Sequence, residues 1–555
     1  MDFSNDDWFC QVDQVYLQSH FGSPLWIVNE NQLDSNIQAI SRFTGYPGRI
    51  LYPVKTNPAP ALLEIIAKNG CGADCSNLSE INLALLCGFP WSSIAYNSPF
   101  QDEKTCRIVL ANGGILVVDD LEVIRFINGL NMDYSGQIWL RMNPVNRVSY
   151  QGNVPNSELM SHGSTSSKFG FPEENLEEVL SEIRFCISGL HLHVGTQMDN
   201  LGAFTFAMES LHRVADALIA KNHPVKHIDI GGGLGISFTN KDVFPTLDEW
   251  VAGLSEQRRK EFLYYTEPGH ALVGNAVALL VSIKTHKASR GRVWAVCDAG
   301  TDQLAKITLL HWPHWVLHQS KRYLPFEGQD ALAGPLCFAG DTLLENTNLE
   351  DTKVNDCLLV TRAGAYTYSL SNSFNGRSAP AWIVMKGLNY QLKTSSEQPF
   401  SRPMLQHHLW MLKEEQTPHL LEKREIEMLS SPYLQTSIQE DSFEIVSVSS
   451  INSNFYEVEL EIQSNMDFVS MPTAVRAIGN ACIVAVLHKH GLESKDRPVI
   501  GKKLDIEYLG HFKTGKAFVK LNLSNEIKKA GEHWTMLVAF ETSDQVCKGT
   551  FVVNV

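Results

Sequence analysis

Short apolar segments alternate with longer amphipathic segments from Pro24 to about Gly269. The apolar segments include PLWIVNE, GRILYPVK and GILVVDD, and the segments between them, such as APALLEIIAKNG, repeat apolar residues at helical spacing. Strands that alternate with helices form parallel sheets, and about eight such units predict a closed (β/α)8 barrel. We therefore predict a barrel over residues 24–270, with its chemistry at the carboxyl ends of the strands.

The pattern changes after Gly269, where closely spaced β segments follow one another without long helices. Together with residues 1–23, residues 271–390 are predicted to form an antiparallel β domain. Residues 391–440 are polar and mixed in charge, which is typical of a linker. Residues 441–555 offer two strands, one long apolar helix and four more strands, which predict an α+β domain with a buried helix.

Composition limits the classes of partner. A net charge of -15 argues against binding to nucleic acid or to an anionic membrane, because both require a basic surface. The chain lacks a signal peptide and an apolar run long enough to span a bilayer, so we expect a cytoplasmic protein. Its 11 cysteines show neither CxxC nor Cys/His spacing, and we predict no disulfide framework and no metal site.

Lys55 is the first candidate for chemistry. It directly follows the apolar run ILYPV, and Asn57-Pro58 forces an extended turn just after it. The amine is therefore predicted to lie at the carboxyl end of a strand. A single lysine at such a position is ordinarily one that extends its charged head out of a packed sheet. The other polar segments of the chain change this interpretation.

Several glycine-rich or polar clusters fall at the ends of other predicted strands. They are His193 in GLHLHVGTQ, Gly231 to Gly233 in DIGGG, Glu267 and Gly269 in TEPGH, Cys337 and Asp341 in GPLCFAGD, and Tyr366 in RAGAYTYS. Taken singly, each has an ordinary structural explanation, such as a tight turn or a core histidine. Together they offer amides for a phosphate, an amine for an aldehyde and a carboxylate for a pyridine nitrogen. These are the needs of pyridoxal 5'-phosphate.

Residues 15–390 resemble the fold-type III pyridoxal-phosphate decarboxylases, a family that includes ornithine, arginine and diaminopimelate decarboxylases. The motifs occur along the chain in the same order as in that family: YPVKTN, GADCSNLSE, LRMNP, SKFG, GLHLHVGTQ, DIGGG, EPG, GPLCFAGD and AGAYTYSLSNSFNG. The resemblance implies that a small amino-acid substrate is decarboxylated to an amine. It implies that Lys55 is the Schiff-base lysine, that His193 stacks on the cofactor ring and that Glu267 partners the pyridine nitrogen.

The resemblance also implies further cofactor contacts and a homodimer. The implied contacts are Asp74, Arg141, Thr196, Gly231, Gly232, Gly233, Gly269, His270 and Tyr366. Cys337 would reach into the partner subunit's site and protonate the product carbon, so that the active sites would be shared between subunits.

Four positions depart from the family pattern. Phe338 stands where an acidic residue usually meets the distal amine of a diamino acid, and an aromatic ring cannot pair with a buried ammonium. We therefore expect a substrate whose far end is not a free amine. The alternative is that the loop is shifted in register, so that Asp341 contacts the distal amine instead. His270 replaces an arginine that usually binds the phosphate. Gln101 and Asn77 replace a lysine and a serine without destroying the site.

The element order of residues 441–555 resembles a hot-dog fold, in which a sheet wraps a central helix. The resemblance is to acyl-thioester enzymes, including acyl thioesterases in which a PY pair, here Pro432-Tyr433, precedes the first strand. The candidate polar groups are Asn465, Asp467, Arg476, Asn480 and His511. The alternative for this domain is a module for dimerisation or for docking a carrier protein.

Three functions remain open from the sequence. The leading one is an amino-acid decarboxylase, with a substrate that is either free or tethered to an acyl or peptidyl carrier protein, in secondary metabolism. The second is a catalytically silent, decarboxylase-like regulator of the antizyme-inhibitor kind. In the third, the C-terminal domain is the main enzyme and acts on acyl thioesters.

Overall fold

The computed structural model describes most of the chain as two compact units, residues 1–399 and residues 400–555. The described residues are 7–394 and 419–554, apart from the segments 131–133, 144–149, 152–153, 155–156, 163–166, 239–242, 320, 324–326, 421–441, 453, 464–470, 490–499, 509–514, 531–532 and 543–546.

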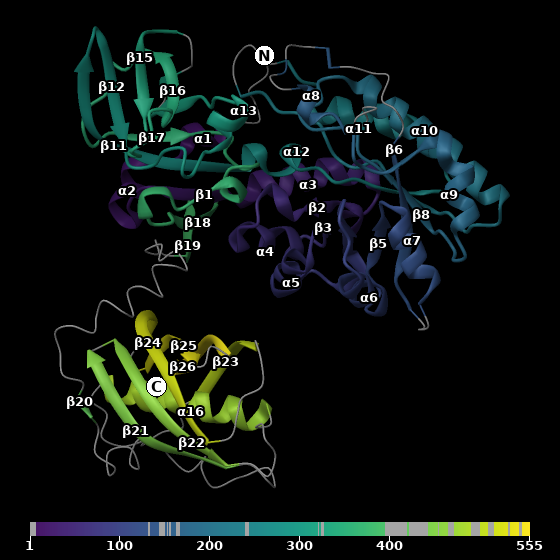
Figure 1. Cartoon of the computed structure of the whole chain (residues 1–555). Coiled ribbons are helices and arrows are strands. Elements are labelled where there is room, and N and C mark those ends of the chain that lie inside the picture. The colour runs from purple at the N-terminus through teal and green to yellow at the C-terminus, as the bar shows by residue number, and fades with distance from the viewer. Residues whose placement is uncertain are drawn as a thin grey trace. The chain divides into compact units, whose positions relative to one another are not determined.

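The first unit contains a barrel of parallel strands (Figure 1). In spatial order these strands are β2 (Leu51–Pro53), β3 (Gly72–Cys75), β4 (Ile94–Asn97), β5 (Ile115–Val118), β6 (Gln137–Asn143), β8 (Gly189–Leu192), β9 (His227–Asp229) and β10 (Leu263–Tyr265). The barrel is closed where Ile50, just before β2, bridges Thr266, just after β10. The Leu51 amide donates to the Thr266 carbonyl at 2.9 Å across this seam. The predicted (β/α) barrel is therefore confirmed.

Helices surround the strands on the outside of the barrel (Figure 1). They are α3 (Glu30–Thr44), α4 (Pro60–Lys68), α5 (Leu78–Leu86), α6 (Glu103–Ala111), α7 (Leu121–Asn128), α9 (Leu176–Glu182), α10 (Leu201–Ala220) and α11 (Leu247–Glu256). Five of them begin with a side chain that accepts a hydrogen bond from the amide three residues later. The capping residues are Asn29, Asn77, Asp102, Asp120 and Thr246. Asn77, which departs from the family pattern, is thus a helix cap, and asparagine caps as well as serine does.

A second sheet adjoins the barrel and contains segments that are far apart in the sequence. Its strands are β1 (Leu25–Asn29), β11 (Val277–Ser289), β12 (Arg292–Cys297), β13 (Val316–His318), β14 (Lys321–Tyr323), β15 (Asp330–Ala333), β16 (Thr342–Thr347), β17 (Cys357–Val360), β18 (Ala381–Lys386) and β19 (Asn389–Thr394). Most neighbours pair antiparallel, as predicted, whereas β1 runs parallel to β18 and β12 runs parallel to β15.

The prediction that the barrel begins at residue 24 with the strand PLWIVNE is wrong, because β1 belongs to the second sheet. This strand pairs with β11 and β18, and all five of its residues are buried. Trp26 and Val28 pack in the large core that includes the barrel, while Leu25 and Ile27 face a separate core. A strand buried on both faces reads as a continuous apolar run in either sheet, so its pattern did not distinguish the two.

The N-terminal residues pack on the second sheet. Helices α1 (Asp7–Gln11) and α2 (Gln14–Phe21) place Phe9 and Leu17 in the separate core, where Leu280 and Leu359 of the sheet also lie. The Trp8 indole donates to the Asn275 carbonyl at 2.8 Å. These contacts attach residues 7–21 to the second sheet.

The second unit is an antiparallel sheet with one long helix, α16 (Met471–Lys489), packed against it (Figure 1). Its strands are β20 (His419–Leu420), β21 (Ser442–Asn452), β22 (Phe455–Gln463), β23 (Ile500–Tyr508), β24 (Gly515–Ala530), β25 (His533–Thr542) and β26 (Cys547–Asn554). Small and branched residues such as Ala477, Ala481 and Val484 are fully buried on the helix. Arg476 and Asn480 lie on α16, whereas Pro432, Tyr433, Asn465, Asp467 and His511 lie outside the described residues.

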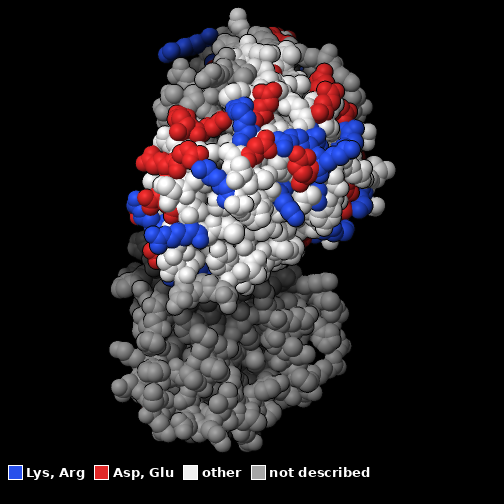
Figure 2. Space-filling view, turned by 90° about the vertical axis from the view of Figure 1, so that its right-hand side faces the viewer, with Lys and Arg blue, Asp and Glu red and all other residues white. Residues whose placement is uncertain are grey.

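Charges of both signs intermingle on the face of the first unit that Figure 2 shows. Exposed ion pairs include Lys221 with Glu177 and Arg259 with Asp216. Such a face offers no single-sign field to a polyanion. Among the described helices, none is both long enough and apolar enough to cross a membrane.

Candidate active site

Lys55 lies directly after β2, in a single 3-10 turn formed by Val54–Thr56. Its Nζ donates to Oδ2 of Asp74 at 2.6 Å, and Asp74, on the neighbouring strand β3, has a fully buried side chain. Burial lowers the pKa of Lys55, but the negative charges of Asp74 and Glu267 raise it to a larger extent, so the net shift is upward. The amine predicted at a strand end is therefore present there, and Asp74 holds it protonated.

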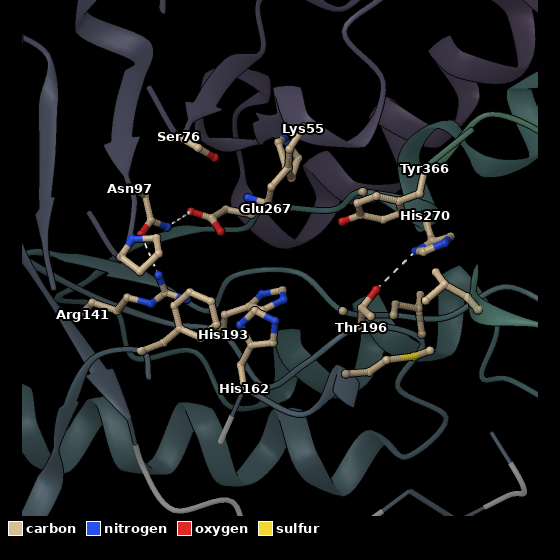
Figure 3. A pocket seen from close by; sticks show the side chains of 18 of the residues that line it. Lys55, Ser76, Asn97, Arg141, His162, His193, Thr196, Glu267, His270 and Tyr366 are labelled. Atoms are coloured by element: carbon tan, nitrogen blue, oxygen red, sulfur yellow. Dashed lines mark hydrogen bonds between the residues drawn. The ribbon is translucent and has the colours of Figure 1, made fainter. Parts of the chain in front are cut away.

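The carboxyl ends of the barrel strands surround a cavity of about 400 Å³ (Figure 3). Most of the predicted site residues line it: Lys55, Arg141, His193, Thr196, Gly233, Glu267, Gly269, His270 and Tyr366. Lys55 and Glu267 lie on one side of the cavity, and His193 and His162 lie on the opposite side (Figure 3). Thr196, His270 and Tyr366 gather at one end (Figure 3).

Glu267 is buried at the base of the site, just after β10. One carboxylate oxygen accepts from Asn97 Nδ2 at 3.3 Å, and the other lies 3.2 Å from His191 Nε2. Burial raises the pKa of this carboxyl group, but attraction to His191 and Lys55 lowers the pKa by a larger amount. The net shift is therefore downward. The site therefore holds a buried carboxylate in its charged form.

The groups around Glu267 come from one layer of the barrel. Arg141, His191 and Asp229 lie side by side in the register of β6, β8 and β9, so their side chains point to the same side. The nearest ligand atoms of His191, Asp229 and Glu267 lie within 4.8 Å of one another. Burial and the charge of Glu267 raise the pKa of Asp229 well above its usual range. Of these two acids, Glu267 therefore holds a negative charge more readily than Asp229 does.

Arg141 connects this layer to a second carboxylate. Its guanidinium donates to Asp119 Oδ2 at 3.0 Å and to Asn97 Oδ1 at 3.2 Å. Both charged groups are more than nine-tenths buried. A buried ion pair of this kind needs all its hydrogen bonds to offset desolvation, and Asp119 also accepts from the amide of Gly170.

His193 is held as a neutral ring. Its Nδ1 accepts a hydrogen bond from the amide of Gly232 at 3.0 Å, and His162 packs against it edge-on at 4.7 Å between ring centroids. Burial, together with the neighbouring His162, lowers the pKa of His193 well below its usual value. A neutral ring facing the cavity is suited to stacking on a flat aromatic ligand.

The close packing around Gly231, Gly232 and Gly233 leaves no room for side chains. A Cβ on Gly232 would lie 1.9 Å from the Glu267 carbonyl, and one on Gly233 would lie 2.4 Å from the Gly195 carbonyl. Gly231 and Gly232 donate their amides to Asp229 and His193, and of the three glycines Gly233 lines the cavity. All three glycines were predicted to bind a phosphate. Of the three, Gly233 lies where its backbone could contact one, whereas the amides of Gly231 and Gly232 are already used within the protein.

Besides Asp74, Gly231 and Gly232, the predicted residues that do not line the cavity of their own chain are Cys337, Phe338 and Asp341. Cys337 and Phe338 are exposed, and the Cys337 amide donates to Asn375 Oδ1 at 2.8 Å. Asp341 is buried and accepts from the amides of Thr301 and Leu336, both at 2.7 Å. Asp341 thus organises the loop, and its carboxylate is occupied by backbone groups.

Several residues at the site did not stand out in the sequence. They are Ser76, Asn97, Asp119, His162, Phe169, His191, Leu310 and Trp312. A signal existed for three of them. His191 and His193 are two apart on one strand and so face the same side, and Asn97 and Asp119 end the apolar runs IAYN and VVD. Leu310 is the last residue of helix α13 (Lys306–Leu310), and the others lie in loops, for which no periodic pattern exists.

A comparison with protein families bears on this geometry. Residues 31–274 match the family model described as the pyridoxal binding domain of pyridoxal-dependent decarboxylases. The matched residues span the barrel, including Lys55, His193 and Glu267. The first unit is therefore a (β/α) barrel that binds pyridoxal phosphate.

Curated relatives and solved structures agree with this class. The chain is 28% identical over 399 residues to a diaminopimelate decarboxylase of Archaeoglobus fulgidus, which covers 69% of this chain and 94% of the relative. A diaminopimelate decarboxylase of Methanothermobacter thermautotrophicus is 29% identical over 392 residues, covering 68% and 89%. The Helicobacter pylori diaminopimelate decarboxylase complexed with L-lysine shares the fold, with a TM-score of 0.61, 21% identity and coverage of 72% and 99%. The protein is a pyridoxal-phosphate-dependent amino-acid decarboxylase.

The residues present fit the cofactor. At the Thr196 end, a Cβ on Gly269 would lie 2.7 Å from Thr56 Oγ1 and 3.6 Å from the Tyr366 hydroxyl, so only glycine leaves the wall open. The buried atoms His270 Nε2 and Thr56 Oγ1 have no hydrogen-bond partner within the described structure. Unsatisfied donors of this kind at the end of a cavity are suited to an anionic group. At the other end, the amine of Lys55 suits the cofactor aldehyde, the carboxylate of Glu267 suits the pyridine nitrogen, and the neutral ring of His193 suits the face of the pyridine ring.

We predict that Asp74→Asn shifts the pH dependence of cofactor attachment downward. Attachment to the aldehyde requires the neutral Lys55 amine, and Asp74 raises the pKa of that amine. Loss of the Asp74 charge should therefore lower the midpoint pH of attachment by about one unit or more.

The measurement is the rate of cofactor binding by absorbance across a pH series. Asp248→Asn, which removes a carboxylate from an exposed ion pair with Arg42, is the matched control. An unchanged midpoint in Asp74→Asn would contradict the electrostatic role of Asp74.

Proposed function

We propose that the protein decarboxylates an amino acid whose distal group is not a free ammonium. Lys55 would attach the cofactor, Glu267 would hold a proton on the pyridine nitrogen, and His193 would support one face of the ring. The single observation that carries this assignment is the convergence of Lys55, Glu267 and His193 on one cavity. Bound pyridoxal phosphate supplies an electron sink for the carbon that loses carbon dioxide.

The chain's own residues prepare that chemistry electrostatically. Glu267 keeps its negative charge because His191 and Lys55 lie against it, and a carboxylate at this depth favours a protonated ring nitrogen. Asp74 pairs with the free amine of Lys55 before the cofactor arrives. Arg141, fixed by Asp119, keeps Asn97 oriented toward Glu267.

The phosphate is assigned to the end of the cavity formed by Thr196, Gly233, Gly269, His270 and Tyr366. Supporting observations are the open wall at Gly269 and the unpartnered His270 Nε2. Thr196 Oγ1 and His270 Nδ1 lie 3.5 Å apart and would orient each other. This assignment leaves the Lys55 end of the cavity for the reacting carbon.

A homodimer with shared active sites is proposed for the same enzyme. Cys337 and Phe338 are exposed and do not line the cavity of their own chain, although they lie in the segment that resembles the family's catalytic loop. Their contribution therefore requires a second copy, in which Cys337 Sγ would deliver the proton to the product carbon. Phe338 would then face the substrate's distal group.

The lining of the cavity supports a substrate with an uncharged tail. Among the described residues that line it, Glu267 is the one acidic side chain, and that carboxylate is assigned to the cofactor. Met160, Leu310 and Trp312 supply apolar surface. A buried ammonium without a carboxylate partner costs about 3–5 kcal/mol. The names of the relatives make diaminopimelate the strongest competing substrate.

For the second unit we propose a hot-dog-like fold that docks or processes an acyl thioester. Its order of two long strands, one long buried helix and four strands supports the proposal. In this arrangement the amino-acid substrate would be tethered to an acyl or peptidyl carrier protein through its side chain. A tethered substrate has no free distal ammonium, so an uncharged residue such as Phe338 would fit beside it. A cytoplasmic location in secondary metabolism is part of the same proposal.

We predict that the protein loaded with pyridoxal phosphate releases carbon dioxide from at least one free amino acid with an apolar or uncharged side chain. The measurement is carbon dioxide release across a panel that includes diaminopimelate, lysine and ornithine, with Lys55→Ala as the blank. Efficient release from a charged diamino acid would contradict the proposed substrate class. Silence across the panel with the cofactor bound would instead favour a tethered substrate or a catalytically silent regulator.

We also predict that Phe338→Glu improves the turnover of a diamino acid. The new carboxylate would pair with the distal ammonium, and kcat/KM for lysine, ornithine or diaminopimelate should rise by about tenfold or more.

Leu392→Glu is the matched control, because Leu392 is as exposed as Phe338, at 49% against 48%. Equal effects of the two substitutions, or no effect of either, would show that Phe338 does not select the substrate.

A further inference from the structure

Lys306 is a fully buried lysine that the site described above does not use. It is the first residue of α13 (Lys306–Leu310), and its side chain has no exposed surface. Its Nζ donates to the Ala365 carbonyl at 2.8 Å and lies over the ring of Phe238, 4.3 Å from the centroid. A carbonyl and an aromatic face stabilise a cation, but neither neutralises its charge.

The groups that face Lys306 are cationic or neutral. His270 and His314 lie close enough for its charge to lower their pKa values, and Arg362 adds to the same effect at His314. Burial lowers the pKa of Lys306 itself well below the usual value for lysine. Within the described part of the chain, Lys306 forms no ion pair with a carboxylate. The protein thus keeps an amine at a place where its charge is uncompensated.

Lys306 lies directly behind the end of the cavity that is assigned to the phosphate. The carbonyl that it contacts belongs to Ala365, the residue before Tyr366, which lines the cavity. Phe238 connects it to the same end from the other side, because this ring packs 6.0 Å from His270 between centroids. The amine is therefore linked to this end of the cavity through Ala365 on one side and through Phe238 and His270 on the other.

The cavity itself offers little free positive charge to a phosphate. Lys55 is paired with Asp74 and would be attached to the cofactor, and Arg141 is paired with Asp119. Burial lowers the pKa of His270 well below its usual value, so this residue, which stands where arginine is usual, contributes a neutral ring. A phosphate dianion at Thr196 and Tyr366 would therefore be undercompensated by the residues that line the cavity.

We propose that Lys306 supplies a positive charge to the cofactor phosphate from behind the cavity wall, and that it takes up a proton from solvent when the phosphate binds. This inference rests on the proposed position of the phosphate. The phosphate supplies the negative charge that the buried amine lacks, and the amine supplies the positive charge that His270 lacks. Each group stabilises the charged form of the other.

The proton uptake fixes the sign of a pH effect. Binding raises the pKa of Lys306 from its low value in the cofactor-free protein, so a proton is taken up between the two pKa values. In that window the affinity for pyridoxal phosphate falls as the pH rises, by up to about tenfold per pH unit for one proton. A protein without the amine lacks this component of the pH dependence.

The test compares wild-type protein, Lys306→Met and Lys284→Met. Methionine keeps the length and volume of the buried side chain, and Lys284, half-exposed and paired with Asp298, is the matched control for loss of a lysine. Dissociation constants are measured for pyridoxal phosphate and for pyridoxal, which lacks the phosphate, at several pH values. Thermal unfolding of the cofactor-free proteins reports whether each variant is folded.

We expect Lys306→Met to weaken the binding of pyridoxal phosphate by about 10- to 100-fold, to change the binding of pyridoxal by less than about twofold, and to flatten the pH dependence. The cofactor-free variant should unfold at the same or a higher temperature, because a buried amine without a carboxylate partner has been removed. A purely structural lysine would instead lower the unfolding temperature and weaken both ligands equally.

Two outcomes overturn the inference. One is equal affinity of wild type and Lys306→Met for pyridoxal phosphate at every pH, and the other is equal weakening of both ligands. Failure of the proposed function is distinguishable from either, because in that case the wild-type protein would bind pyridoxal phosphate no more tightly than pyridoxal, or would bind neither.

Discussion

The buried carboxylate of Glu267 is the charge around which the rest of the site is arranged. A carboxylate inside a barrel is strongly unfavourable unless it is paired and hydrogen-bonded. His191 and Asn97 satisfy its two oxygens, Arg141 fixes Asn97, and Asp119 neutralises Arg141. Each partner comes from a different strand. Lys55, just after β2, also lowers the pKa of Glu267, and closure of the barrel brings β10 back beside β2.

The parallel barrel explains how residues distant in sequence form one site. Every strand delivers its carboxyl end to the same rim, so the residue that follows an apolar run becomes a candidate for chemistry. Lys55, Asp74, Arg141, His193 and Glu267 were identified in this way or through the resemblance that their motifs carry. The same rule applied to the runs IAYN and VVD would have added Asn97 and Asp119, and strand alternation would have added His191.

Other features could not be predicted, for physical reasons. The strand Leu25–Asn29 is buried on both faces, and its apolar run is compatible with either sheet. Asp341 is acidic and lies in the right loop, but backbone amides occupy its carboxylate, which only the folded loop reveals. Trp312 and Leu310 reach the cavity from the end of α13 and the loop after it, where no periodicity guides an inference.

The two ends of the cavity have different electrostatic character. The Lys55 end is dense with paired charges, whereas the end near His270 contains neutral rings and apolar side chains. The neutral His270 and the apolar surface from Trp312 and Leu310 lie at the same end. His270, the departure from the family pattern at this end, would thus bear on the proposed binding of the phosphate.

The account depends most directly on the identity of the residue that holds the cofactor. Reduction of the protein loaded with pyridoxal phosphate, followed by proteolysis and mass spectrometry, would locate the attached pyridoxyl group. We predict that it lies on Lys55 alone. Attachment to Lys306 or to a surface lysine, with Lys55 unmodified, would contradict the proposed active site.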